Sequence, residues 1–391
     1  MSKITSPSTL NEQVEYNGTY FGDLTWLVSP ETGSKVSYAS ARKKIRSIAF
    51  HLNARGMAPG SKIAVAANNG ISSCLTILGI IYAGHIALPL NLVAGSKIIA
   101  YTLDHSETAL IFTANDCEKL ISEALSDFKK EVEIIKLDSQ LGPIWGKEAP
   151  NETFVKKENV SAEEIAVIMY TSGTTGNPKG VMLSHSNLLA AGRYISSGHE
   201  VDHKDTALCV LPIYHINGLC VTVMGTLASA STLVLPDRFS VNAFWTIIET
   251  HRCTWFSAVP TQYSYILNNK SMPGKIPFLR FARSASAPLS PEIHRKFEER
   301  FKIPIIETMG LTETGSQIST NPLPPKVRKI GSPGKAFGNK LMIGNELSDE
   351  VSPGIIGEIL VKGNNVMKGY FKQPDETAKT ITKEGWLKTG D

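Results

Sequence analysis

The stretch from Tyr170 to Gly180 constrains the fold of this chain most, because it places a glycine-rich loop between two regular elements. It reads Tyr-Thr-Ser-Gly-Thr-Thr-Gly-Asn-Pro-Lys-Gly. The preceding residues 165–170 are apolar and β-prone, which predicts a buried strand. The residues after Gly180 begin apolar and continue into Ser184, a pattern typical of a capped helix start. We therefore expect the loop to connect a strand to a helix, where α/β sheets often bind phosphate.

The residue types of this loop suit a polyphosphate. Two of its glycines, Gly173 and Gly176, let backbone N–H groups approach an anion closely. Side-chain donors accompany them: Thr171, Ser172, Thr174, Thr175 and the cation Lys179. A Walker phosphate loop is excluded, because it needs four residues between a glycine and Gly-Lys-Ser/Thr. A flexible linker explains the loop poorly, since a linker needs neither a lysine nor a proline between regular elements.

The same stretch resembles the phosphate-loop signature of the adenylate-forming superfamily, which includes acyl- and aryl-CoA synthetases, luciferases and peptide-synthetase adenylation domains. The resemblance continues in family order from about Lys35 to Asp391. It implies an enzyme that uses ATP and Mg²⁺ to activate a carboxylic acid as its adenylate. The loop would hold the phosphates, with Lys179 also taking part in catalysis.

Composition limits the alternatives. A chain of 391 residues is long enough for two or three subdomains. Its 40 basic and 36 acidic residues give a net charge of +4, which is too balanced to indicate a nucleic-acid partner. The cysteines are scattered and the N-terminus is polar, which favours a cytoplasmic protein. The longest apolar run, 74–92, contains glycine, histidine and proline, and predicts a buried helix and strand rather than a membrane span.

β-prone and helix-prone segments alternate along most of the chain, whereas residues 1–35 and 138–160 look irregular. The alternation predicts an α/β fold of two doubly wound, mainly parallel sheets. After about residue 331, frequent glycine and proline with short strands predict a small C-terminal β subdomain. We expect one N-terminal adenylation core with subdomains at 1–205 (phosphate loop), 206–330 (substrate pocket) and 331–391 (β subdomain).

By the same resemblance, residues 211–219 border the acid. His215 would be catalytic, because a neutral imidazole there can donate to a carboxylate or form a flat wall beside it. Adenylation domains for α-amino acids usually place an aspartate here to hold the ammonium, so His215 argues against an amino-acid substrate. The segment 258–263 closes a strand with a proline turn and resembles a pocket lining. The implied substrate pocket comprises Tyr214, His215, Asn217, Gly218, Val259 and Tyr263.

Two further segments resemble the nucleotide site. The loop 284–289 would lie beside the adenine, and it departs from the family, which usually has one or two glycines there. Its nucleotide-binding residues would be Ser284, Ala285 and Ser286. In the run 307–314, Glu313 would hold Mg²⁺ and Thr312 would contact the phosphates, both with catalytic roles. Met309 replaces the tyrosine that normally stacks on adenine, and a thioether can still pack on an aromatic face. The remaining nucleotide contacts would be Thr308 and Gly310.

Residues 357–363, 367–370 and 386–391 match the family's later signatures. Asp391 would accept hydrogen bonds from both ribose hydroxyls through its two carboxylate oxygens. In the family, a small C-terminal domain that carries a catalytic lysine follows this aspartate, and that domain is absent from the sequence as given. We therefore expect this chain to bind ATP and its acid, but to adenylate slowly and to transfer the acyl group hardly at all.

These patterns predict a carboxylate–CoA ligase that forms an acyl-adenylate and then a thioester with coenzyme A. Two alternatives stay open: an adenylation domain that loads the phosphopantetheine of an acyl or peptidyl carrier protein, and a non-catalytic nucleotide-binding protein on the same fold. The acid is open as well. Asn217 and residues 319–322 are similar to segments in ligases for small dicarboxylic acids, whereas Tyr214 and Val259 suit an aryl or medium-chain acid. Arg283 could meet an acidic substrate tail, although a surface or core-edge position is the simpler expectation.

Overall fold

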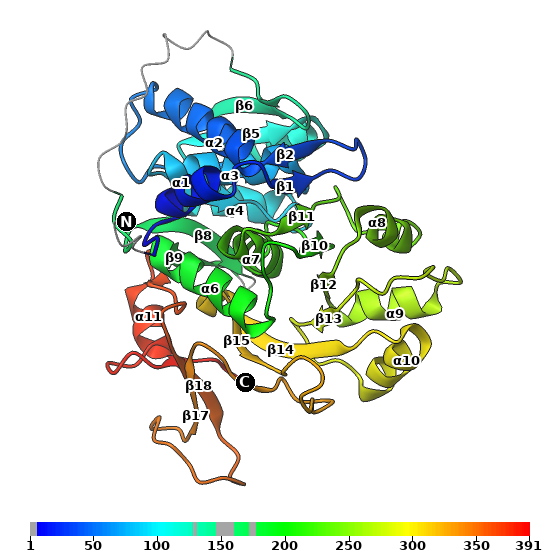
Figure 1. The fold of residues 1–391 in the computed structure, drawn as a ribbon. Coiled ribbons are helices and arrows are strands. Elements are labelled where there is room, and N and C mark those ends of the chain that lie inside the picture. Colours follow the sequence, from blue (N-terminus) through cyan, green and yellow to red (C-terminus); the bar gives the residue numbers. More distant parts are fainter. Residues whose placement is uncertain (1–5, 127, 129–130, 146–159, 172–176) are drawn as a thin grey trace, which may run out of the picture.

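The computed structural model describes residues 6–126, 128, 131–145, 160–171 and 177–391. Two large sheets and one small sheet organise them (Figure 1). The first sheet has the order β19 (Gly369–Tyr370), β9 (Lys179–Ser184), β8 (Ile165–Thr171), β4 (Ile86–Pro89), β3 (Lys62–Ala66), β5 (Leu110–Ala114), β6 (Glu133–Asp138) and β7 (Gly142–Pro143). The second has the order β16 (Lys335–Ala336), β15 (Ser316–Thr320), β14 (Ile305–Leu311), β13 (Phe281–Ser284), β12 (Trp255–Ala258), β10 (Thr206–Cys209), β11 (Thr232–Val234), β1 (Thr25–Val28) and β2 (Lys35–Ser37). The small antiparallel sheet joins β17 (Lys340–Gly344), β18 (Glu358–Lys362) and β20 (Leu387–Lys388).

Helices cover both faces of each large sheet. They are α1 (Leu10–Tyr20), α2 (Tyr38–Asn53), α3 (Ile71–Tyr82), α4 (Ser96–His105), η1 (Asn115–Cys117), α5 (Glu118–Leu125), α6 (His185–Gly198), the π-helix η2 (Asn217–Met224), α7 (Gly225–Ser229), α8 (Phe244–His251), α9 (Pro260–Asn268), α10 (Pro291–Phe301), η3 (Thr312–Thr314) and α11 (Pro374–Thr380). Among the described residues, no helix is both long and apolar enough to cross a membrane.

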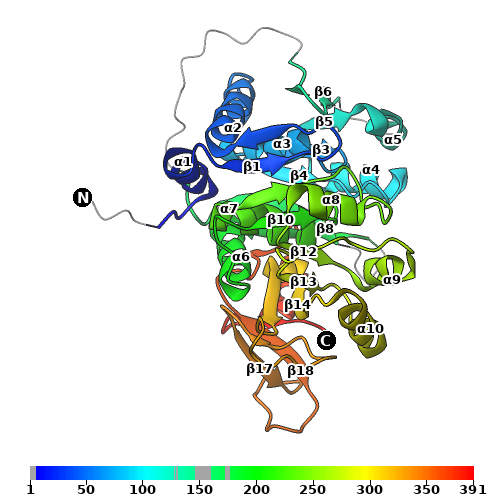
Figure 2. The ribbon, with the colours of Figure 1, turned by 45° about the vertical axis from the view of Figure 1, so that its right-hand side comes forward.

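The core is layered because successive side chains of a strand point to opposite faces of its sheet. On β3, Ile63 and Val65 pack in the cluster that contains α2 and α3, whereas Ala64 and Ala66 pack with α4 and α5. That first cluster also reaches α6, η2 and the second sheet, and α8, α9 and α10 cover the outer face of the second sheet. The layers therefore run helix, sheet, helix, sheet, helix (Figure 2).

The predicted α/β fold is confirmed. From β1 through β11, β10, β12 and β13 to β14, every neighbouring pair of the second sheet is parallel. In the first sheet β8, β4, β3, β5 and β6 are parallel. Among the described residues, antiparallel strands occur only toward the ends of each order, at β19, β9 and β7 in the first sheet and at β2, β15 and β16 in the second.

The expectation that residues 1–35 are irregular is wrong. Thr9 and Glu12 form a capping box, in which each side chain satisfies an N–H at the start of α1. Residues 25–28 then pair with β11, about two hundred residues away in sequence. The proline turn expected at 258–263 is wrong too, because Pro260 begins α9, where its fixed φ and missing N–H suit the first helical turn.

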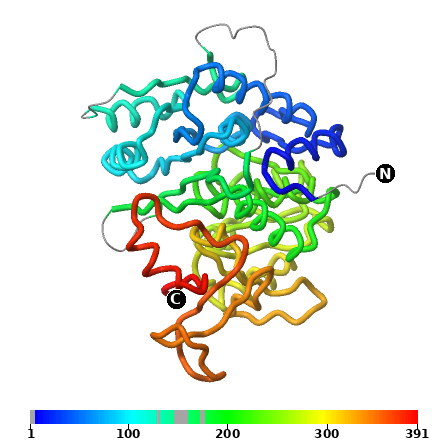
Figure 3. The backbone as a smooth tube through the Cα atoms, turned by 90° about the vertical axis from the view of Figure 1, so that its left-hand side faces the viewer, coloured from blue at the N-terminus to red at the C-terminus, as the bar shows by residue number. Residues whose placement is uncertain are grey.

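Sheet membership does not follow the order of the chain. β1 and β2 precede the first sheet in sequence but belong to the second, whereas β19 returns from near the C-terminus to pair with β9. Figure 3 shows this red segment lying beside the green hairpin of the first sheet. The proposed division at residues 205 and 330 therefore describes the chain order and not the sheets.

A buried histidine joins α10 to β14 and to the loop that follows β15. His294 is 1% exposed; its Nδ1 lies 2.8 Å from Glu307 Oε1 and its Nε2 lies 2.9 Å from Glu298 Oε1. Burial disfavours the charged imidazole, but the two carboxylates outweigh that cost and raise the pKa of His294. Arg328 also pairs with Glu298, so the two cations Arg328 and protonated His294 are balanced by the two carboxylates of Glu298 and Glu307.

We predict that His294→Gln lowers the free energy of unfolding by about 3–5 kcal/mol at pH 6, because it leaves a buried carboxylate without its partner. The pKa of His294 is raised in the folded state, so its contribution is complete below the unfolded pKa and is lost as pH rises through the folded pKa. Urea unfolding at pH 6 and pH 9 should therefore give a smaller difference at pH 9. Lys296→Gln, which breaks an exposed ion pair on the same helix, should change stability little at either pH. An equal loss from His294→Gln at both values would contradict the assignment.

Candidate active site

The predicted phosphate loop closes a β-hairpin. The expectation that it leads directly into a helix is wrong, because residues 179–184 form β9, antiparallel to β8, before α6 begins. Thr171 lies opposite Lys179 in the register, so the two ends of the loop are held together. The capped helix start is confirmed: Ser184 accepts from Asn187 N in a capping box. Several predicted phosphate ligands lie outside the described residues: Ser172, Gly173, Thr174, Thr175 and Gly176.

Tyr370 contacts both the loop lysine and the predicted metal ligand. Lys179 Nζ lies 5.1 Å from the centre of the Tyr370 ring, and the Tyr370 hydroxyl donates to Glu313 Oε1 at 2.9 Å. Lys179 also pairs with Glu376 at 2.7 Å. Glu376 carries a second cation, Lys379, and the two lysines lower the pKa of Glu376 to about 2. Tyr370 and Glu376 come from the β19–α11 segment, which the register of β19 on β9 places here.

Glu313 fits a divalent cation. It lies in η3, where Gly315 ends the turn in the left-handed conformation, and its backbone carbonyl accepts from Met367 N at 2.8 Å. Its side chain is partly exposed, and within the described residues it pairs with no lysine or arginine. Such a carboxylate, oriented by one hydrogen bond and otherwise uncompensated, offers the hard oxygen that Mg²⁺ prefers.

The predicted adenine and phosphate residues of β14 pack against the loop at 284–289. Thr308 is buried and donates from Oγ1 to Ser284 O at 3.2 Å. A side chain at Gly310 would place its Cβ 1.7 Å from Ser316 O, so the hairpin with β15 requires glycine there. Met309, beside it, and Thr312, at the start of η3, are half-buried.

Four residues of the predicted substrate pocket lie at or just before the start of η2: Tyr214, His215, Asn217 and Gly218. Tyr214 is buried with its ring centre 4.9 Å from that of His215, which is exposed. Partial desolvation nevertheless lowers the pKa of His215, so the imidazole is neutral at pH 7 and can donate one hydrogen bond. Val259 is half-buried just before α9. Tyr263 is fully buried between Phe256 and Phe297, so its ring belongs to the helix–sheet core.

Arg283 is neither a surface nor a core-edge residue, because its exposure is 0%. From β13 its Nη1 donates to Asn217 Oδ1 at 3.3 Å and to Ser257 Oγ at 3.1 Å, and its Nη2 donates to Gln317 Oε1 at 3.4 Å. Asn217 in turn donates from Nδ2 to Ser286 Oγ at 3.0 Å. Arg283, directly before the loop 284–289, thus contacts Asn217 in the segment 211–219 that is expected to border the acid.

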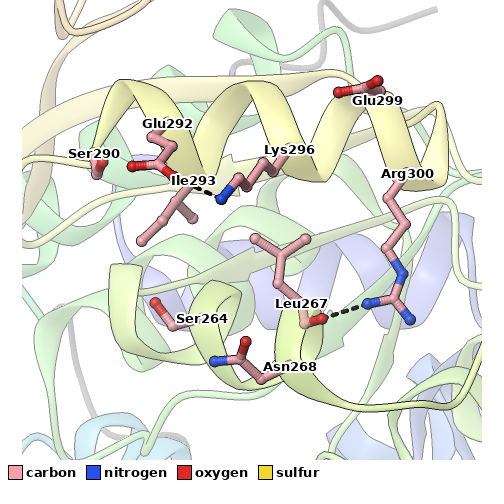
Figure 4. A pocket seen from close by; sticks show the side chains of 9 residues that line it. All are labelled: Ser264, Leu267, Asn268, Ser290, Glu292, Ile293, Lys296, Glu299 and Arg300. Atoms are coloured by element: carbon pink, nitrogen blue, oxygen red, sulfur yellow. Dashed lines mark hydrogen bonds and ion pairs between the residues drawn. The ribbon is translucent and has the colours of Figure 1, made fainter.

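Within the part of the chain that the structure describes, no hydrogen bond joins Asp391 to these groups. Asp391 is exposed; its backbone pairs with Ile359 and Thr389, and within the described residues its carboxylate forms no ion pair. A surface groove between α9 and α10 is lined by none of the predicted site residues (Figure 4). The cations that line it are already engaged, Lys296 with Glu292 at 2.6 Å and Arg300 with the carbonyl of Leu267.

Comparison with known proteins decides the family. A family model described as AMP-binding enzyme matches residues 14–371. The chain belongs to this family. It is 37% identical over 395 residues to the sulfoacetate–CoA ligase of Cupriavidus necator, covering 100% of this chain and 77% of that protein. The oxalate–CoA ligase of Arabidopsis thaliana is 33% identical over 349 residues, or 86% of this chain and 67% of that protein. The crystal structure of ATP-bound MatB from Rhodopseudomonas palustris has a TM-score of 0.85 at 26% identity, covering 99% of this chain and 76% of that one.

The predicted class of this AMP-binding enzyme, an ATP-dependent carboxylate–CoA ligase, is therefore confirmed. Sequence reasoning missed the contacts of Tyr370, Glu376, Ser257 and Gln317. Tyr370 belongs to a matched family signature and could have been found by asking what its hydroxyl reaches. The others become visible only once the sheet register is known.

We predict that Gly218→Ala displaces residues 211–219, the segment of this AMP-binding enzyme that is expected to border the acid. The new Cβ would lie 2.1 Å from Pro212 O, a backbone atom, so the start of η2 must shift and unfolding should become easier by about 3 kcal/mol or more. Gly225→Ala is the matched control, because the nearest atom to its Cβ belongs to the side chain of Ile195, at 3.0 Å, and the nearest backbone atom lies 3.9 Å away. It should change stability by no more than about 1 kcal/mol. Thermal unfolding of the two variants compares them, and equal effects would contradict the packing.

Proposed function

We propose that this AMP-binding enzyme activates a small carboxylic acid that carries a second anionic group, and then joins it to coenzyme A. The proximity of Lys179, Tyr370 and Glu313 carries the first part of the proposal. It sets a cation for phosphate oxygens beside a carboxylate that fits Mg²⁺, at the mouth of a hairpin loop rich in hydroxyl and N–H donors.

The residues divide the work between nucleotide and acid. Lys179, with Thr171 and the loop hydroxyls, holds the phosphates in line with the attacking carboxylate, and Thr312 contacts them from η3. Thr308, Met309 and Asp391 hold the nucleoside. Magnesium, which Glu313 would hold, neutralises charge on the phosphates when bound.

Neutral His215 donates to the acid, which keeps the reacting oxygen oriented. In the first step a carboxylate oxygen of the acid bonds to the α-phosphorus of ATP, and pyrophosphate leaves. In the second step the sulfur of coenzyme A, having lost its proton, bonds to the carbonyl carbon, and AMP leaves. This chain's residues position the reactants throughout, because little covalent work falls to the protein in such a transfer.

The choice of acid draws on the relatives. One acts on sulfoacetate and another on oxalate. Each of these acids carries a second anionic group beside the carboxylate that becomes the thioester, and both are small. Coenzyme A is favoured over a carrier protein as acceptor, since the relatives are CoA ligases.

We predict that Glu313→Gln lowers kcat/KM for ATP by about 10²–10³ relative to the unmodified chain, because one preorganised charge at the phosphates is lost. Acid-dependent release of pyrophosphate measures this, and Lys179→Met should behave similarly. Glu350→Gln, an exposed carboxylate just beyond β17, is the control and should leave the rate unchanged. Unchanged turnover in the Glu313 and Lys179 variants would overturn the assignment of the phosphate and metal site.

A further inference from the structure

Arg283 is a fully buried cation that is not matched by an anion. Its hydrogen-bond partners Asn217, Ser257 and Gln317 are all neutral, and its Nε has no partner. Within the described residues, no aspartate or glutamate pairs with it. His199, which shares the oxygen of Gln317 at 3.1 Å, is held neutral because burial and the nearby arginines lower its pKa to about 3.

Arg280, three residues before Arg283, has a counter-ion, which Arg283 lacks among the described residues. Arg280 donates to Asp205, with Nη1 at 2.6 Å from Oδ2, and so forms an ordinary ion pair. Burial lowers the pKa of Arg283 to about 9, which still leaves it charged at neutral pH. A buried charge without a counter-ion is costly, so its retention points to an anion that arrives with a ligand.

Arg283 also fixes the direction of a hydrogen-bond chain. A guanidinium can only donate, so the atom of Asn217 that faces it must be the amide oxygen, which also accepts from Ser257 Oγ at 3.1 Å. The amide nitrogen of Asn217 therefore donates to Ser286 Oγ. Because that oxygen already accepts, the hydroxyl proton of Ser286 is free to donate outward.

Ser286 is the exposed end of this hydrogen-bond chain, whereas Asn217 is 5% exposed and Arg283 is 0% exposed. Its φ of 74° lies in the left-handed region, which favours glycine. A serine held there against its backbone preference indicates that the hydroxyl has a use. The resemblance places Ser286 beside the adenine, but its hydrogen bond to Asn217, two residues from His215, joins its hydroxyl to the segment expected to border the acid.

We propose that Arg283 and Asn217 orient Ser286 as a donor to the second anionic group of the acid, so that this chain selects acids with a carboxylate or sulfonate tail over neutral acids of the same size. The inference rests on the proposed function and names the residues that set its substrate class. Arg283 and Asn217 are positioning residues; Ser286 makes the contact. A hydrogen bond to a charged group in such a site is worth about 10- to 100-fold in affinity.

The test compares two non-reacting acyl-adenylate mimics that differ only in the tail charge. They are 5′-O-(N-malonylsulfamoyl)adenosine and its malonamoyl counterpart, in which an amide replaces the second carboxylate. Isothermal titration with the unmodified chain should show the malonyl mimic binding about 10- to 100-fold more tightly. Equal affinity would overturn the inference but leave the proposed function standing. No binding of either mimic, or of AMP, would overturn both.

Two variants separate specificity from structural support. Asn217→Asp keeps the size of the side chain but neutralises Arg283 and no longer donates to Ser286, and Ser286→Ala removes the hydroxyl. Each should abolish the preference for the malonyl mimic while leaving the affinity for the malonamoyl mimic within about threefold. Ser290→Ala, at an exposed serine beyond the loop, should keep the preference. If Asn217→Asp and Ser286→Ala lower the affinity for both mimics equally, the hydrogen bonds from Arg283 to Ser286 only support the fold. That result would contradict the proposal.

Discussion

Among the residues that the structure describes, the buried Arg283 in the second sheet has no counter-ion, and the proposed acid side of the site depends on it. Arg283 projects from β13 and binds Ser257 on β12, Gln317 on β15 and Asn217 at the start of η2. The parallel register sets Ser257 directly beside Arg283. One cation therefore cross-links three strands to the π-helix that presents His215, and π-helical turns are themselves frequent at functional sites.

The phosphate side depends on a different constraint, the return of the chain to the first sheet. β19 pairs with β9, and this single antiparallel contact brings Tyr370 and Glu376 to Lys179. Glu313 arrives from the second sheet and meets Tyr370. Groups almost two hundred residues apart are thus assembled where the two sheets meet, and the ion pair of Lys179 with Glu376 is the contact that phosphate oxygens would replace.

Local patterns predicted most of the fold. The strands at 62–66, 86–89 and 110–114 are buried, short and flanked by helices, so their period and length identified them. Local signals were also present where the prediction failed: Thr9 and Glu12 spell a capping box, and Pro260 stands where a helix begins. What sequence could not show was pairing at long range, such as β1 with β11, because register depends on the whole sheet.

The site followed the same rule. Motifs identified the residue types, and the family resemblance assigned their roles. The burial of Arg283 was not predictable, because a charged residue in a short strand gives no sign of which groups will surround it. The sequence departs from the family pattern at Met309 and Ser286. Met309 pairs in the β14–β15 hairpin, and Ser286 accepts a hydrogen bond from Asn217.

The proposed reaction requires an oxygen of the acid to bond to the α-phosphorus of ATP. Incubating the protein with ATP, coenzyme A and malonate labelled with ¹⁸O in its carboxyl groups tests this directly by mass spectrometry of the nucleotide products. We expect AMP that carries one labelled oxygen, because the acid oxygen that bonds to phosphorus stays there when the acyl group is removed. Labelled inorganic phosphate with ADP, or unlabelled AMP, would show that the acid is not activated as its adenylate and would contradict the proposed function.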